Sequence, residues 1–261
     1  TERWLRRDIE LSKAMGFNGA RLHQKAFEPR FLYWADKLGY LCWGESADWG
    51  LDYSSAEAMS NHLAEWVEIV QRDRNHPCII GWCPTNETPE SQRRDSIALL
   101  YSTTRAIDPC RPIIDTSGYT HVMTDMDDNH DYAQDPREFA KNQDPLRTGA
   151  PFRNHATDAA YRGQPFMCSE YGGIWWNPGQ KDNMAWGYGD RPRSEKEFIE
   201  RLRGLTDVLL DNPCMSGFCY TQLTDVEQEV NGLYTFDRKL KFAPERIAEI
   251  LKRRAAIENK I

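Results

Sequence analysis

The chain has 261 residues, of which 40% are hydrophobic and 28% charged, and its formal net charge is −7. An acidic chain lacks the clustered basic surface that nucleic acids require, so we expect no nucleic-acid partner. No apolar run reaches the roughly 20 residues that span a bilayer, so we expect no membrane partner either.

Helices and strands alternate along the first half of the chain. Apolar residues at helical spacing predict helices over residues 2–15, 29–38 and 57–72. Short apolar runs predict strands over residues 17–23, 40–43 and 78–83. Polar side chains stand at or just beyond the ends of these strands: Arg21, His23, Gln24, Glu45, Asn86 and Glu87.

The alternation continues in the second half. Helices are predicted over residues 92–107, 194–210 and 244–257, the second opening on the capping pair Ser194 and Glu197. Strands are predicted over residues 112–115, 165–169 and 215–221, with one more short strand between residues 120 and 135. We assign residues 127–132 to a loop, and the polar residues 136–163 to an excursion rich in Pro, Asn and Gly.

This alternation predicts an α/β fold in which helices wrap a parallel sheet, as in a (β/α)8 TIM barrel. Residues 1–261 suit a single domain of that kind. Only seven strands are predicted, whereas a closed barrel has eight, and the chain opens on a helix without a preceding strand. We therefore expect the first barrel strand to be missing from the amino end.

Two strands deliver a glutamate. Residues 72–77 read Arg-Asp-Arg-Asn-His-Pro, and the apolar run 78–83 that follows leads to Asn86 and Glu87. Residues 166–172 read Phe-Met-Cys-Ser-Glu-Tyr-Gly, an apolar strand that ends at Glu170 before a glycine pair. Carboxylates at the carboxyl ends of barrel strands are typical of catalytic sites.

Together these motifs resemble the catalytic barrel of glycoside hydrolase family 2, the β-galactosidase and β-glucuronidase family. The resemblance implies a retaining exo-β-glycosidase that acts on a carbohydrate substrate, with Glu87 as acid/base and Glu170 as nucleophile. It also implies β-sandwich domains and the first barrel strand upstream of this chain. A homo-oligomer is left open as an alternative source of the missing segment.

The resemblance assigns further residues to substrate binding. It implies that Arg21 and Tyr132 keep the nucleophile charged, and that Asn86 binds the sugar 2-hydroxyl. His130, two residues before Tyr132, joins this set, as do Trp175 and Trp176, because indole faces stack on sugar rings.

The chain departs from the family pattern in two places. After the second-strand arginine the family has Ser-His-Tyr-Pro, whereas residues 22–25 here read Leu-His-Gln-Lys, so either His23 or Gln24 contacts sugar. Glucuronidases carry an Asn-x-Lys element, and the corresponding residues 230–234 read Val-Asn-Gly-Leu-Tyr. A β-galactosidase-like activity is therefore favoured over a β-glucuronidase.

Other chemistries are disfavoured. The six histidines are scattered, no phosphate-binding glycine loop occurs, and we expect neither a metal nor another cofactor. The seven irregularly spaced cysteines favour free thiols in a reducing compartment, so we expect a cytoplasmic location, with a secreted or periplasmic one open if a signal was trimmed. The alternative to an enzyme is a non-catalytic carbohydrate-binding or inactive truncated barrel fragment.

Overall fold

The computed structural model describes residues 1–177, 179 and 184–260. They form two compact units: the first contains Thr1–Lys13, Asn18–Asn129 and Arg153–Pro165, and the second contains Ala14–Phe17, His130–Phe152 and Phe166–Ile261. No helix among the described residues combines the length and the apolar character needed to cross a membrane. That the whole chain is one domain stays a prediction.

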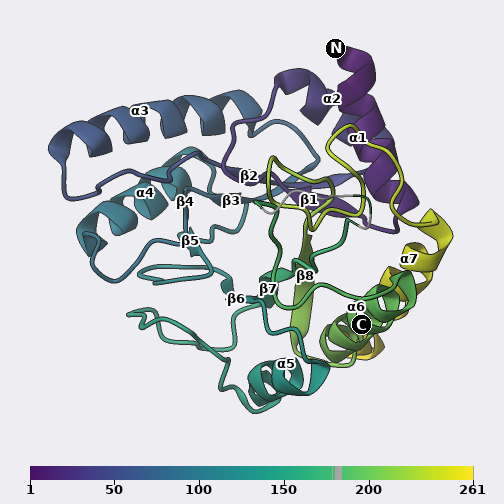
Figure 1. Cartoon of the computed structure of the whole chain (residues 1–261). Helices are drawn as coiled ribbons and strands as arrows, with labels where there is room; N and C mark the ends of the chain where they lie inside the picture. Colours follow the sequence, from purple (N-terminus) through teal and green to yellow (C-terminus); the bar gives the residue numbers. More distant parts are fainter. Residues whose placement is uncertain (178, 180–183, 261) are drawn as a thin grey trace. The chain divides into compact units, whose positions relative to one another are not determined.

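The first unit is built on a parallel sheet with the strand order β1-β2-β3 (Figure 1). Its strands are β1 (Gly19–Arg21), β2 (Leu41–Glu45) and β3 (Ile79–Cys83). Its helices are α1 (Glu2–Ala14), α2 (Pro29–Leu38), α3 (Ala56–Asp73) and α4 (Arg94–Ile107). In the parallel register Arg21 lies beside Trp43, and Glu45 lies beside Cys83, so the polar ends of three strands meet at one edge.

Local signals explain the predicted helices. The carboxylate of Glu28 accepts a hydrogen bond from the backbone N–H of Arg30, Pro29 occupies the first turn of α2, and Gly39 ends it with φ of 61°. Ser55 caps α3 in the same way by accepting from Ala58. These helices therefore begin and end within one residue of the predicted positions.

The core of the first unit lies between its helices and strands. Trp66 on α3 and Trp82 on β3 are 0% and 1% exposed, and their rings meet edge to face at 5.8 Å. Each indole N–H has a partner: Trp66 donates to Thr104 Oγ1 and Trp82 donates to Asp108. Both rings are buried and both N–H groups have the partner that a buried donor requires, so the two tryptophans have a structural role in the core.

The strand predicted over residues 112–115 is wrong in its bounds. Only Ile113 pairs there, in an isolated bridge with Trp82, and the regular strand is β5 (Thr116–Ser117). It pairs in parallel with β4 (Thr85–Asn86), which continues the chain of β3 after Pro84. Proline has no N–H to donate, so it interrupts the ladder at this point.

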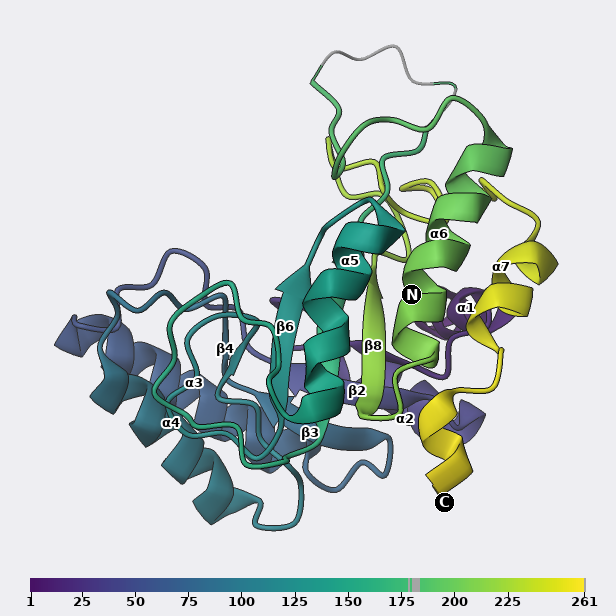
Figure 2. The ribbon, with the colours of Figure 1, turned by 90° about the horizontal axis from the view of Figure 1, so that it is seen from below.

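The second unit contains a sheet of order β6-β7-β8, and its outer strands β6 and β8 are labelled in Figure 2. Its strands are β6 (Asp127–Asp131), which begins in the residues of the first unit, β7 (Phe166–Gly172) and β8 (Met215–Thr221). Its helices are α5 (Pro136–Gln143), α6 (Glu195–Leu210), α7 (Pro244–Leu251) and the 3-10 helices η1 (Asp144–Thr148) and η2 (Ala256–Lys260). Helix α6 contacts α5 and α7 as well as the strands β7 and β8.

Two predictions for this unit are wrong. The polar excursion expected from residue 136 begins with two helices, α5 and η1, because Asp135 caps α5 and Phe139 anchors it at 0% exposure. The closing helix ends at Leu251 rather than at residue 257, and the chain continues into η2.

The loop predicted over residues 127–132 is also wrong, because residues 127–131 form β6 and all five are buried. Neutralising partners make this burial possible. His121, fully buried, places Nδ1 2.8 Å from Asp115 and Nε2 3.0 Å from Asp128. Asp127 pairs with Arg153, and Asp128 also accepts from Ser117 Oγ at 2.9 Å. Buried charges are tolerated when they are paired in this way.

Candidate functional site

The predicted acid/base glutamate follows β4 in the first unit. Asn86 is 2% exposed and lies beside Ser117 of β5, and the backbone N–H of Glu87 donates to the Ser117 carbonyl at 2.9 Å. Glu87 itself is half-buried and has φ of 48°. A left-handed backbone is uncommon for a residue other than glycine, and strained residues of this kind cluster at functional sites.

Asn86 has one end of its amide occupied. Its Oδ1 accepts from Arg21 Nη2 at 2.6 Å, and its backbone N–H donates to Asp48 Oδ2 at 3.1 Å. Within the described part of the chain, its Nδ2 is buried and has no hydrogen-bond partner. A buried donor held without a partner suits a ligand oxygen, because leaving such a group unpaired costs free energy.

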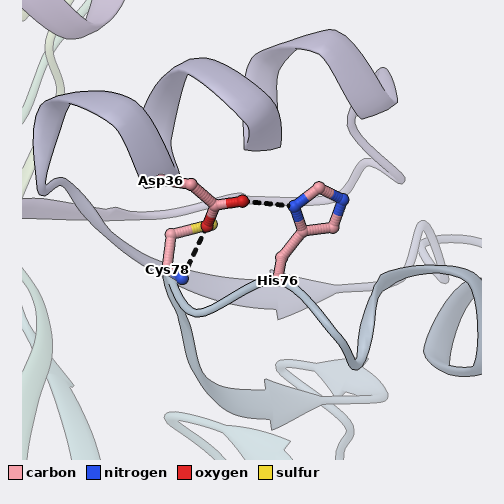
Figure 3. A group of neighbouring side chains, drawn as sticks. All are labelled: Asp36, His76 and Cys78. Atoms are coloured by element: carbon pink, nitrogen blue, oxygen red, sulfur yellow. Dashed lines mark hydrogen bonds and ion pairs between the residues drawn. The ribbon is translucent and has the colours of Figure 1, made fainter.

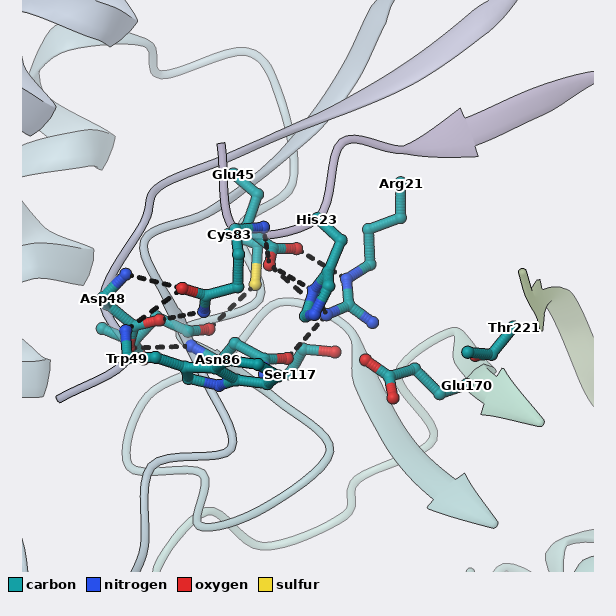
Figure 4. Close-up of polar contacts among 12 residues, drawn as sticks. Arg21, His23, Glu45, Asp48, Trp49, Cys83, Asn86, Ser117, Glu170 and Thr221 are labelled. Carbon is teal, nitrogen blue, oxygen red and sulfur yellow. Dashed lines mark hydrogen bonds and ion pairs between the residues drawn. The ribbon is translucent and has the colours of Figure 1, made fainter. Parts of the chain in front are cut away.

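Arg21 forms a buried ion pair with Glu45, which the sequence interpretation placed only at the end of a strand (Figure 4). Arg21 Nε lies 2.6 Å from Glu45 Oε2, and the two side chains are 3% and 0% exposed. Burial raises the pKa of Glu45, but the charge of Arg21 and the hydrogen bonds from His23 and Arg21 together outweigh burial, so the pKa of this carboxyl lies below its usual value. Arg21 is therefore held rigidly where it contacts Asn86.

The structure separates the roles of His23 and Gln24. His23 Nδ1 lies 2.9 Å from Glu45 Oε1, while its side chain is 41% exposed. The side-chain amide of Gln24 hydrogen-bonds to the loop after β2: Oε1 accepts from the backbone N–H of Asp48 and of Trp49, and Nε2 donates to Asp48. Sugar contact by either residue stays a prediction, and this geometry favours His23.

Asp48 is a site residue that the sequence interpretation missed. It is 5% exposed and accepts from Gln24, from the backbone of Asn86 and from the hydroxyl of Tyr53. Burial raises its pKa to about 6. Its only sequence signal is a position three residues after Glu45, at the carboxyl end of a strand.

The predicted nucleophile, Glu170, lies on β7 in the second unit and is 9% exposed. The hydroxyl of Tyr132 donates to Glu170 Oε2 at 2.5 Å, and His130 Nδ1 lies 3.4 Å from the same oxygen. Burial and the charge of Glu170 raise the pKa of Tyr132 well above its usual value, so the phenol keeps its proton and remains a donor. Such donors stabilise the ionised carboxylate.

Two glycines shortly after Glu170 make room for aromatic rings. Gly172 and Gly173 have φ of 81° and 56°. A Cβ on Gly172 would lie 2.5 Å from the ring of Tyr220, and one on Gly173 would lie 2.3 Å from the ring of Tyr188. Tyr188 stacks on Tyr132 with centroids 3.5 Å apart. The glycine pair thus allows the ring that carries the donor hydroxyl to be packed in place.

The two predicted sugar-stacking tryptophans of the second unit differ. Trp176 is 7% exposed, packs against Phe198 and Phe242, and accepts a hydrogen bond from Lys241 through its carbonyl. This environment favours a packing role. Trp175 is half-buried, with the Arg191 guanidinium 5.9 Å from its ring centroid.

One side-chain group of the first unit has the donor types of a metal site: Asp36, His76 and Cys78 (Figure 3). Its atoms already satisfy one another, because Asp36 accepts from His76 Nδ1 at 2.6 Å and from the backbone N–H of Cys78 at 2.9 Å. A hydrogen bond with Cys42, burial and the neighbouring Asp36 raise the pKa of the Cys78 thiol, which opposes formation of the thiolate that a metal requires. The group fits a polar clamp at the start of β3 better than a metal centre.

The comparisons with known proteins agree on a family. The family model described as Glycosyl hydrolases family 2, TIM barrel domain, matches residues 1–254. The chain is 28% identical over 113 residues to a β-glucuronidase from Chlorocebus aethiops and 30% identical over 130 residues to a β-galactosidase from Vibrio cholerae. These matches cover 41% and 47% of this chain but only 17% and 12% of those proteins.

Solved structures match almost the whole chain. A β-glucuronidase from an uncultured Clostridium sp. has a TM-score of 0.76 at 20% identity, covering 97% of this chain and 47% of that one. A family 2 β-galacturonidase from Eisenbergiella tayi, solved with galacturonate, has a TM-score of 0.76 at 18% identity, with coverages of 96% and 47%. At such identities the likeness concerns the fold alone.

The fold is thus of the TIM-barrel type, although hydrogen bonding groups the described strands into three sheets. That its first strand lies before Thr1 stays a prediction. Since the family match extends to residue 254 of 261, this chain belongs to glycosyl hydrolase family 2, in whose TIM barrel domain it lies.

Proposed function

We propose that this domain is the catalytic part of a retaining exo-β-glycosidase, with Glu170 as nucleophile and Glu87 as acid/base. The hydrogen bond from Tyr132 to Glu170, 2.5 Å long, is the observation that carries the proposal. A nucleophilic carboxylate must be ionised while its partner acid holds a proton, and a donor that hydrogen-bonds one of the two carboxylates favours the charged form of that one.

The reaction has two steps. Glu170 attacks the anomeric carbon while the glycosidic C–O bond breaks and Glu87 gives its proton to the departing oxygen. Glu87 then takes a proton from water, the water oxygen attacks the anomeric carbon, and the ester bond to Glu170 breaks. This mechanism requires the two carboxyl groups to lie about 5–5.5 Å apart. The Nδ2 of Asn86, which has no hydrogen-bond partner among the described residues, supports a contact with the sugar 2-hydroxyl, which strengthens in the transition state.

For the glycon, we propose galactoside-like sugars ahead of glucuronides. Residues 230–234 contain no lysine, and Asn231 is 0% exposed and hydrogen-bonded to Glu229 and Gln222. The buried ammonium group of Lys241 forms an ion pair with Asp225 at 2.5 Å, so its charge is already paired within the protein. Proteins named β-glucuronidase and β-galactosidase both resemble this chain, so the glycon needs a direct measurement. A panel of nitrophenyl β-glycosides would provide it.

The rival proposal is a carbohydrate-binding or inactive barrel fragment. The separation of the described strands into three sheets favours it, because an open barrel holds its side chains less rigidly. Assaying the panel with this chain alone and with a version extended upstream by a first barrel strand discriminates between the two. Turnover by the longer protein only would assign the loss to the fragment, and turnover by neither would refute the enzyme.

The roles of the two glutamates are tested by azide rescue. We expect Glu170→Gly to abolish turnover, and added azide to restore it with an α-glycosyl azide as product. Glu87→Ala should spare the first step with good leaving groups, which need little protonation, and lower it by about 10²–10⁴-fold for poor ones. With azide, the Glu87→Ala variant should form a β-glycosyl azide. The opposite pair of anomers would show that the two roles are exchanged.

A further inference from the structure

Trp49 stands out in the first unit because its large indole is 64% exposed. It lies in the loop that follows β2, four residues after the buried Glu45. Single exposed apolar side chains are ordinary at protein surfaces, so exposure alone indicates nothing. What distinguishes Trp49 is how firmly its backbone and neighbours are held.

A hydrogen bond to the half-buried side chain of Gln24 holds the backbone of Trp49. Its N–H and that of Asp48 donate to Gln24 Oε1 at 3.1 and 2.8 Å. The Asp48 carboxylate in turn accepts from the Tyr53 hydroxyl at 3.0 Å and from the backbone N–H of Asn86 at 3.1 Å. The loop that carries the exposed indole is therefore joined directly to the strand that delivers Asn86 and Glu87 (Figure 4).

His23 flanks the indole. Its ring meets that of Trp49 edge to face, with centroids 5.3 Å apart and an angle of 81° between the planes. The imidazole is itself held by Glu45 at 2.9 Å. One side of the indole is thus supported by a fixed ring while most of its surface stays open. Preorganised aromatic surfaces of this kind bind ligands with little loss of side-chain entropy.

We propose that Trp49, flanked by His23, is a stacking platform for the sugar ring on the leaving-group side of the substrate, an inference that rests on the proposed glycosidase function. The C–H faces of sugars are apolar enough to stack on an indole. The buried Nδ2 of Asn86, without a partner among the described residues, is assigned above to the sugar 2-hydroxyl, and it places the glycon beside this loop because the Asn86 backbone is bonded to Asp48. The acid/base residue faces the glycosidic oxygen, so a platform tied to its strand contacts the departing group.

Acceptor competition tests the platform. A glycosyl–Glu170 intermediate formed from a nitrophenyl glycoside can pass its sugar to glucose or to methanol: the acceptor oxygen attacks the anomeric carbon, the ester bond breaks and the acceptor proton goes to Glu87. Glucose needs the leaving-group subsite, whereas methanol is too small to stack. We expect Trp49→Ala to lower the ratio of glucose transfer to methanol transfer about tenfold, which equals about 1.4 kcal/mol.

Two variants serve as controls. Trp49→Phe keeps an aromatic face and should retain most of the wild-type ratio. Trp4→Ala removes the exposed indole of α1, 51% exposed, and should leave the ratio unchanged. An unchanged ratio in Trp49→Ala, or an equal fall in both transfers, would overturn the platform. A wild-type protein that forms no glycosyl intermediate would instead refute the glycosidase, and the platform with it.

Discussion

The carboxylate of Glu45 gives the sharpest test of how the first unit holds its site. Four donor groups converge on it: Arg21 Nε at 2.6 Å, Arg21 Nη2 at 3.4 Å, His23 Nδ1 at 2.9 Å and the Gln24 backbone N–H at 2.9 Å. Glu45→Gln keeps the shape and one acceptor but leaves the Arg21 charge buried without its counterion. Breaking a buried ion pair lowers the free energy of unfolding by about 3–5 kcal/mol. Because Glu45→Gln retains one acceptor, we expect a loss of about 3 kcal/mol, at the lower end of this range.

Urea unfolding followed by circular dichroism measures this loss, and Glu10→Gln is the matched control. The Arg6–Glu10 pair has a similar N–O distance, 2.7 Å, but its side chains are 49% and 48% exposed, so we expect a change within about 0.5 kcal/mol. Because the folded-state pKa of Glu45 is lowered, its ionisation stabilises the protein above about pH 4.5, and this contribution is lost as the pH falls through the folded pKa. Equal losses in the two variants, or a Glu45→Gln deficit that persists unchanged into acid, would refute the reasoning.

Two further predictions concern single side chains. Tyr132→Phe removes the donor to Glu170, so kcat/KM should fall about 10–150-fold, as expected for the loss of a hydrogen bond to a charged group. The acidic limb of the pH profile of kcat/KM should also move to higher pH. A limb that does not move would contradict the assigned contact. His121→Gln should destabilise the protein more at pH 6 than at pH 9. Burial lowers the pKa of His121, but its bonds to Asp115 and Asp128 raise it well above the usual value, so its stabilisation is complete below about pH 6.5 and is lost as the pH rises through the folded pKa. Unfolding at both pH values measures this, and an equal loss would show that the imidazole is neutral.

The sequence predicts the regular elements well where local signals and burial agree. Helix α2 has the predicted bounds, Pro29–Leu38, because the proline in its first turn and the left-handed Gly39 mark both ends. Strand β8, Met215–Thr221, also has the predicted bounds. A short strand was predicted between residues 120 and 135, but its place at β6 was not, because the five polar residues Asp127–Asp131 look solvated until partners distant in the chain, such as His121, are placed beside them.

In the candidate site, too, some residues could be predicted from the sequence and others could not. Tyr132 and Glu170 were predicted from the family resemblance, and their side chains meet in the second unit. The contributions of Glu45 and Asp48 were not, because their roles depend on the register between β1 and β2 and on a loop joined to the backbone of Asn86. Contacts between side chains on neighbouring strands depend on the tertiary structure. They join residues that are distant in the chain, so local spacing in the sequence does not predict them.

The glycine pair after Glu170 has a consequence for mutational tolerance. Neither Gly172 nor Gly173 carries a reactive group, yet any side chain at either position would meet a tyrosine ring and strain a left-handed backbone. In a saturation library screened for activity, both positions should therefore be as intolerant of substitution as Glu170, the proposed nucleophile. Engineering that seeks new substrates through this turn is better directed at the rings that pack on it than at the glycines.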